Sequence, residues 1–161
     1  MTATHNTGFI NQSQTIATQR LEYPEWHMGR TRYGVWALEI DSAEILERFH
    51  SAQRALADYL LPQYQRQPHI TLYACGFLDW VAPYHPQAND NVSQQRLEQQ
   101  REKMSEQLQN ITQAGAGFKL TVGAIDSFSS VPYLQVRDPA QQLKKLRAAC
   151  NIGELEGDDF R

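Results

Sequence analysis

The pattern of apolar and polar positions predicts alternating strands and helices along the chain. Strand patterns, either alternating or continuously apolar, occur at residues 33–40, 68–77, 118–125 and 131–137. Segments with apolar residues three or four positions apart, typical of helices with one buried side, occur at residues 41–61, 93–112 and 138–150. The predicted order is therefore β-α-β-α-β-β-α, with a hairpin formed by the last two strands.

Several residues predict where these elements begin and how they are placed. Residues 33–40 are apolar on both faces for most of their length, which indicates a central strand. Asp41 and Ser42 are expected to cap the first helix. Asp138 and Pro139 predict the start of the last helix, with Asp as N-cap and Pro in the first turn.

The ends and the longest connection are less regular. Residues 1–30 are rich in Thr, Asn and Gln, and we expect a poorly ordered arm whose aromatic end, residues 23–28, could pack onto the body. Residues 31–161 would then form the folded domain. Residues 78–92 predict an unusually long loop, and loops of that length are often lids or binding loops.

The strand at residues 68–77 carries the candidate chemistry. Pro68 is tolerated at the first position of a strand. Side chains alternate along a strand, so His69, Thr71 and Tyr73 are expected on one face, and the residues between them face the core. An imidazole moves protons near neutral pH and a hydroxyl donates a hydrogen bond, so this face could address one anion. The same residues are also compatible with a purely structural role, as a histidine at a strand edge and a threonine that favours β-structure.

Composition narrows the class of protein. The chain has 161 residues, 41% apolar and 20% charged, as expected for a globular protein of one domain or two small lobes. Its net charge of -3 predicts no large nucleic-acid footprint. Two cysteines predict neither a disulfide framework nor a zinc site. No signal peptide and no apolar run of about 18 residues is present, so we expect a cytoplasmic protein without a membrane contact.

The segment Pro68-His69-Ile70-Thr71-Leu72, placed after a strand and an amphipathic helix, resembles the two-histidine (2H) phosphoesterases. This superfamily includes the 2′-5′ RNA ligase-like proteins and the cyclic phosphodiesterases. The resemblance extends over residues 33–161, because a second helix, the hairpin and the helix at residues 138–150 follow in the order of that family. It implies an α+β fold of two lobes, with antiparallel sheets lining a cleft and helices outside.

The resemblance also implies a reaction. Each lobe would supply one His-x-Thr/Ser, and one histidine would take a proton while the other gives one. The hydroxyls would hold the non-bridging phosphate oxygens as charge develops. His69 would be the general acid or base and Thr71 a phosphate donor, without metal or cofactor. The implied enzyme is a phosphodiesterase acting on 2′,3′-cyclic or 2′-5′ phosphodiesters of nucleotides or RNA ends, with the direction, hydrolase or ligase, left open.

The sequence departs from the family pattern in one respect. It contains one credible motif, whereas a second is expected on a strand just after the last helix. The chain ends at Phe160-Arg161, so we expect it to stop immediately before that motif and to leave the second lobe incomplete. Groups that act as a unit do not keep half their activity when one is removed, so the 161-residue chain alone would hold half an active site.

Four further residues are candidates for substrate binding. Tyr73 and Tyr133 could line the cleft or stack on a base, or simply pack in the sheets. Arg32 and Arg161 could contact phosphate because guanidinium groups match its geometry, or could be surface charges. Two other functions stay open: a non-catalytic module of the same fold that binds RNA ends or nucleotides, and a structural domain in which the His-x-Thr is fortuitous.

Overall fold

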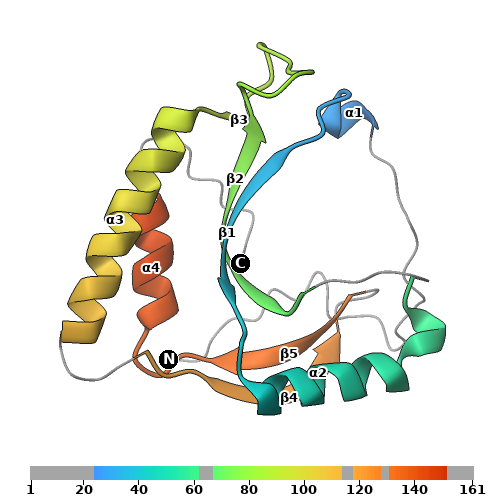
Figure 1. Ribbon diagram of the computed structural model, residues 1–161. Helices are drawn as coiled ribbons and strands as arrows, with labels where there is room; N and C mark the ends of the chain where they lie inside the picture. Colours follow the sequence, from blue (N-terminus) through green and yellow to red (C-terminus); the bar gives the residue numbers. More distant parts are fainter. Residues whose placement is uncertain (1–23, 62–66, 114–117, 128–130, 152–161) are drawn as a thin grey trace, which may run out of the picture.

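A computed structural model describes residues 24–61, 67–113, 118–127 and 131–151. The helices in these residues are α1 (Pro24–His27), α2 (Ala43–Ala55), α3 (Gln94–Gln113) and α4 (Gln142–Cys150), with the 3-10 turn η1 (Ala57–Tyr59) after α2. The strands are β1 (Tyr33–Glu39), β2 (His69–Leu78), β3 (Asn91–Val92), β4 (Thr121–Ser127) and β5 (Pro132–Arg137). The mixed α+β architecture is confirmed (Figure 1).

The first sheet has the strand order β1-β2-β3, so β2 is its central strand. β1 and β2 are antiparallel, with Glu39 opposite His69 and Tyr33 opposite Phe77, while β3 pairs parallel to the end of β2. The prediction that the first strand is central is wrong, because β1 lies at the edge of the described sheet. Along β1 exposed residues alternate with half-buried ones, and Val35 is 46% exposed.

The second sheet is the antiparallel pair β4–β5, which confirms the predicted hairpin. Thr121 lies opposite Arg137 at one end and Ser127 opposite Pro132 at the other. The Arg48 side chain of α2 reaches this hairpin and donates a hydrogen bond of 2.7 Å from Nη2 to the carbonyl oxygen of Gly123.

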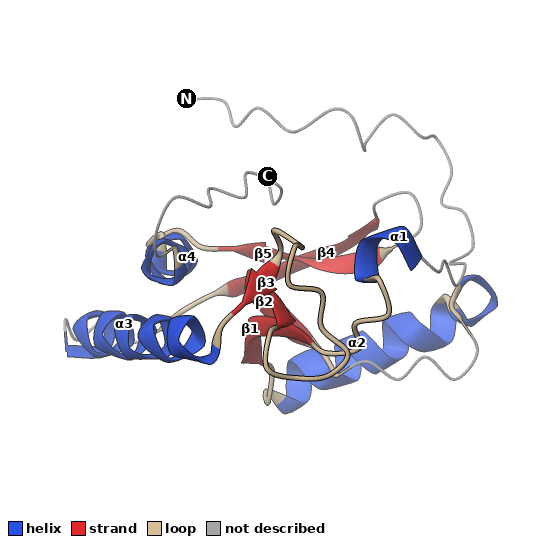
Figure 2. Cartoon of the chain, turned by 90° about the horizontal axis from the view of Figure 1, so that it is seen from above, coloured by secondary structure: helices blue, strands red, loops and turns tan. Residues whose placement is uncertain are grey.

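Helices α3 and α4 pack side by side on one side of the first sheet, and α2 lies on the other side (Figures 1 and 2). One cluster of buried core residues comes from β2, α3 and α4, and it consists of Leu72, Ile111, Leu143 and Leu146. Half-buried apolar side chains of β1, β2, α3 and the hairpin surround them. The predicted apolar stripes of α3 and α4 face this core through Met104, Ile111, Leu143 and Leu146. The stripe predicted for α2 does not, because α2 has no buried residue and contributes none to this cluster.

The helix starts differ in how they are capped. The Ser93 hydroxyl accepts a hydrogen bond from the backbone N–H of Arg96 (3.2 Å), so α3 begins where the sequence predicts. Ser42 stands at the N-cap position of α2, but its side chain makes no cap hydrogen bond. The predicted start of the last helix is wrong: α4 begins at Gln142.

The reason is a turn between Asp138 and α4. The backbone N–H of Gln141 donates to the carbonyl oxygen of Asp138 (3.1 Å), and Gln141 has a φ of 54°. The Asp138 carboxylate still caps the helix from beyond this turn. It accepts hydrogen bonds from the backbone N–H groups of Gln142 (2.8 Å) and Leu143 (2.7 Å).

The described end of the N-terminal arm packs onto the body, as the sequence suggests. The Trp26 ring lies 5.4 Å from Tyr33 and 5.0 Å from Phe77, measured between ring centroids. Residues 24–30 include α1 and the buried Arg30, whereas residues 1–23 lie outside the described part. No described helix has the length and apolarity that a membrane crossing requires.

Candidate active site

His69 and Thr71 lie at the start of β2, the central strand of the first sheet. Their cross-strand partners are Glu39 and Ala37, which are two positions apart in β1, so His69 and Thr71 share one face. Glu39 and Ala37 are both exposed, and the His69 side chain is exposed as well. The face that carries the motif is thus the one turned away from α3 and α4.

The local structure fixes the orientation of the His69 ring. Its Nδ1 lies 2.8 Å from the carbonyl oxygen of Gln67, two residues earlier. A carbonyl oxygen can only accept, so Nδ1 carries a proton in this contact. Nε2 is therefore the atom that takes or gives a proton, and the ring is held ready for either role.

A side-chain contact also holds the residues just before His69. The amide of Gln67 donates a hydrogen bond to the carboxylate of Glu39, which stands across from His69. This contact joins the last residue of β1 to the segment just before β2. The sequence reading missed Gln67 and Glu39 as partners, because their pairing depends on the antiparallel register and not on any local pattern.

Tyr73 does not continue the alternation of His69 and Thr71. The register between β1 and β2 shifts after Thr71, which pairs with Ala37, and Tyr73 pairs with Trp36 instead. Trp36 lies on the side of β1 that faces the helices, where its indole N–H donates to Gln100 (3.0 Å). The expectation that Tyr73 shares the motif face by simple alternation is therefore wrong, since a bulge intervenes.

The other candidate binding residues are not gathered around His69. Arg32 precedes β1, whereas His69 pairs with the last residue of that strand, so at a rise of about 3.3 Å per residue they are on the order of 20 Å apart. Tyr133 lies on β5 in the hairpin, where it is 36% exposed. Arg161 lies outside the described residues.

The hydroxyl of Tyr133 donates a hydrogen bond to Oδ2 of Asp126 on β4 (3.2 Å). Asp126 also accepts from the backbone N–H of Ser127 (2.8 Å) and from the Gln135 amide (3.1 Å), and these hydrogen bonds lower its pKa. Desolvation and the neighbouring Asp126 raise the pKa of Tyr133, so its hydroxyl stays protonated at neutral pH and keeps its hydrogen bond to Asp126.

Thiolate chemistry is disfavoured at the described cysteines. Burial raises the pKa of Cys75 and of Cys150 to about 11, so both are neutral thiols near pH 7. The described residues include no group of three or more His, Cys, Asp or Glu side chains that could hold a metal ion.

One residue that the sequence reading missed touches the motif from another element. The guanidinium of Arg147 on α4 donates a hydrogen bond from Nη2 to the carbonyl oxygen of Thr71 (3.1 Å). The contact joins residues that are far apart in the chain. From the sequence, Arg147 is expected only to lie on the polar side of the last helix, so the sequence pattern does not identify it as a partner of Thr71.

Comparison with known proteins adds one finding. A family model described as the 2′-5′ RNA ligase superfamily matches residues 35–153. The match includes the whole of β2 with His69 and Thr71, the hairpin and α4. Searches of curated proteins and of solved structures found no match to the chain.

Proposed function

Because the chain belongs to the 2′-5′ RNA ligase superfamily, we propose that it is a phosphodiesterase for 2′,3′-cyclic or 2′-5′ phosphodiesters of nucleotides or RNA ends. The observation that carries this proposal is the arrangement at the start of β2. There an exposed His69 ring, held through Nδ1, shares a face with the Thr71 hydroxyl. Cleavage of an RNA-derived phosphodiester needs a base, an acid and hydrogen-bond donors to the phosphate oxygens. His69 can supply one of the two proton transfers, and Thr71 can supply one donor.

In the proposed reaction, neutral His69 takes a proton at Nε2 from water or from a ribose hydroxyl. The activated oxygen bonds to phosphorus, and the bond from phosphorus to the leaving oxygen breaks. A second acid then protonates the leaving oxygen. In the opposite assignment, protonated His69 gives its Nε2 proton to the leaving oxygen, and another base activates the nucleophile.

Thr71 acts on the phosphate and not on the proton. Its hydroxyl donates a hydrogen bond to a non-bridging oxygen, where negative charge increases as the reaction proceeds. The second acid or base would come from the other lobe of the proposed two-lobed fold, to which we assign the β4–β5 hairpin. The separation of the described strands into two sheets supports that assignment.

The test is hydrolysis of 2′,3′-cyclic nucleotides by the full-length protein with a chelator present. We expect His69→Ala to lower kcat by about a hundredfold or more. His50→Ala is the matched control, because His50 is an exposed histidine on α2 whose ring contacts Gln53 (3.2 Å). Equal activity of the two variants would remove His69 from the mechanism, and loss of wild-type activity on chelation would refute metal independence.

A binding module of the same fold is the second candidate. One observation favours it: the other histidines of the described residues, His27, His50 and His85, lie outside the strands, on α1, on α2 and in the loop after β2. One proton carrier is enough to bind a phosphate but not to complete acid–base catalysis. Titration with a 2′,3′-cyclic nucleotide that shows binding through His69 without any turnover would favour this candidate.

A further inference from the structure

Helix α4 is packed directly against the strand that carries His69 and Thr71. Leu146 is 2% exposed and Leu72 is 7% exposed, and both belong to the same buried cluster. Leu146 directly precedes Arg147 in the chain, and Leu72 directly follows Thr71, and Arg147 and Thr71 are the two residues joined by the hydrogen bond. The core packing therefore fixes the main chain of Arg147 relative to the main chain of Thr71.

Both ends of α4 are anchored as well. At its start, the Asp138 carboxylate accepts hydrogen bonds from two backbone N–H groups of the first turn. At its end, the carbonyl oxygen of Cys150 accepts a hydrogen bond from the buried Gln100 amide on α3 (2.8 Å). Because α4 is held at its core face and at both ends, the backbone position from which the Arg147 side chain extends is fixed.

The part of β2 that Arg147 contacts is weakly supported by other strands. Among the described residues, β3 pairs only with Phe77 and Leu78, so no strand pairs with the edge of β2 beside Thr71 that faces away from β1. On the β1 side, the register shifts immediately after the pair of Ala37 and Thr71. The bond from Arg147 Nη2 to the Thr71 carbonyl oxygen (3.1 Å) lies at this interruption of the ladder.

We propose that Arg147 is a positioning residue for the His69–Thr71 segment, which deepens the proposed function and rests on it. The guanidinium holds the Thr71 carbonyl and thereby sets where the Thr71 hydroxyl and the His69 ring point. Catalysis depends on such placement, because a shift of about 1 Å costs a large factor in rate.

The variants separate the hydrogen bond from the bulk of the side chain. Arg147→Met keeps an unbranched apolar stem and removes every donor, while Arg147→Lys keeps a charge and a donor. Lys144→Met is the matched control, since Lys144 is an exposed cation on the same helix. On 2′,3′-cyclic nucleotides we expect Arg147→Met to lower kcat by about tenfold. We expect KM to change by less than about threefold, and Arg147→Lys to restore most of the loss.

A second measurement does not depend on turnover. In the ligand-free full-length protein, we expect Arg147→Met to shift the carbonyl ¹³C resonance of Thr71 and the imidazole resonances of His69. Arg147→Lys and Lys144→Met should leave them close to wild type. Thermal unfolding of all variants shows whether a change is local to the site or a loss of fold.

The two measurements also separate this inference from the proposed function. Resonances and kcat that are the same in Arg147→Met and Lys144→Met would overturn the role of Arg147, even in an active enzyme. A wild-type protein without turnover would instead count against the proposed function. In that case the shift of the Thr71 and His69 resonances alone decides whether Arg147 holds the segment.

Discussion

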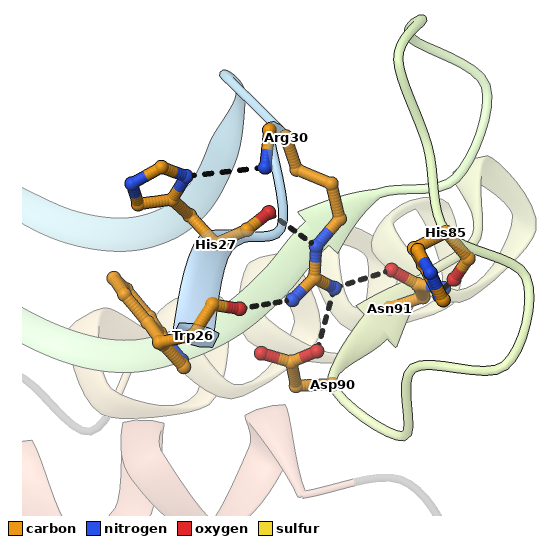
Figure 3. Close-up of polar contacts among 7 residues, drawn as sticks. Trp26, His27, Arg30, His85, Asp90 and Asn91 are labelled. Atoms are coloured by element: carbon orange, nitrogen blue, oxygen red, sulfur yellow. Dashed lines mark hydrogen bonds and ion pairs between the residues drawn. The ribbon is translucent and has the colours of Figure 1, made fainter. Parts of the chain in front are cut away.

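At the scale of single residues, Arg30 shows how one buried side chain can join distant segments. Arg30 is 4% exposed, and the central carbon of its guanidinium lies 3.9 Å from the centroid of the Phe77 ring. The guanidinium donates hydrogen bonds to Trp26 O (2.7 Å), His27 O (3.0 Å), Asp90 Oδ1 (2.6 Å) and Asn91 Oδ1 (2.7 Å) (Figure 3). The N-terminal arm, the end of β2 and the start of β3 thus meet at one group.

This geometry predicts that Arg30→Lys is not conservative. An ammonium group cannot reach four acceptors in a plane and stack on a ring, so we expect the free energy of unfolding to fall by about 2 kcal/mol or more. Arg32→Lys, at an exposed position two residues away, is the control and should stay within about 0.5 kcal/mol of wild type. Urea unfolding measures both, and equal midpoints would refute the role of Arg30.

The face on which each motif side chain lies was predictable from the sequence wherever side chains alternate regularly along the strand. The spacing of His69 and Thr71 places them on one face, and the register confirms this. The alternation fails at Tyr73, because a bulge follows Thr71 and nothing in the local sequence marks it. Contacts such as that between Arg147 and Thr71 depend on packing between elements and have no local signature.

At the scale of elements, the strand pairing at the end of β2 depends on a close backbone approach. The backbone N–H of Phe77 donates to the carbonyl oxygen of Asp90 (2.9 Å), just before β3. Gly76 has a φ of 118°, and a Cβ atom there would lie 2.4 Å from that same carbonyl oxygen. Glycine is therefore required on two grounds, the backbone conformation and the space.

We expect Gly76→Ala to lower the free energy of unfolding by about 2–4 kcal/mol, because strain and a backbone clash add together. Gly29→Ala is the control: its φ of 77° is also positive, but a Cβ there would meet only the Pro83 side chain at 4.0 Å. That variant should cost about 1 kcal/mol. Thermal unfolding distinguishes the two, and an equal cost would mean that β3 simply moves aside.

Element boundaries were predictable where a local cap decides them. The start of α3 follows from Ser93, whose hydroxyl bonds within the first turn. The start of α4 does not follow from Asp138, because the carboxylate reaches the helix across an intervening turn. The edge position of β1 was not predictable either, since an apolar strand suggests a central position whether or not a strand pairs with each of its edges.

At the scale of the whole molecule, Gln100 joins the first sheet to helices α3 and α4 through hydrogen bonds. It is completely buried, and its Oε1 accepts a hydrogen bond from the Trp36 indole of β1 (3.0 Å). Its Nε2 donates to the carbonyl oxygen of Cys150 at the end of α4 (2.8 Å). Polar residues on a helix usually indicate a solvated face, so the sequence pattern of α3 conceals this role.

Replacing Gln100 with Met keeps the volume and removes the partner of two polar groups, the half-buried Trp36 N–H and the buried Cys150 carbonyl. We expect the free energy of unfolding to fall by about 2–4 kcal/mol, because each unsatisfied group costs about 1–3 kcal/mol. Gln99→Met, at the exposed neighbouring position, should change it by less than about 0.5 kcal/mol. Urea unfolding measures both variants.

The same variant tests whether α4 positions the motif. If the anchored helix holds Arg147 against Thr71, releasing the end of α4 at Cys150 should also move the Thr71 carbonyl resonance in the folded protein. The shift should have the same direction as that caused by Arg147→Met. A destabilised Gln100→Met variant with unchanged Thr71 resonances would show that Leu146 and the Asp138 cap suffice to hold α4. The core packing and the motif geometry would then be independent of this link.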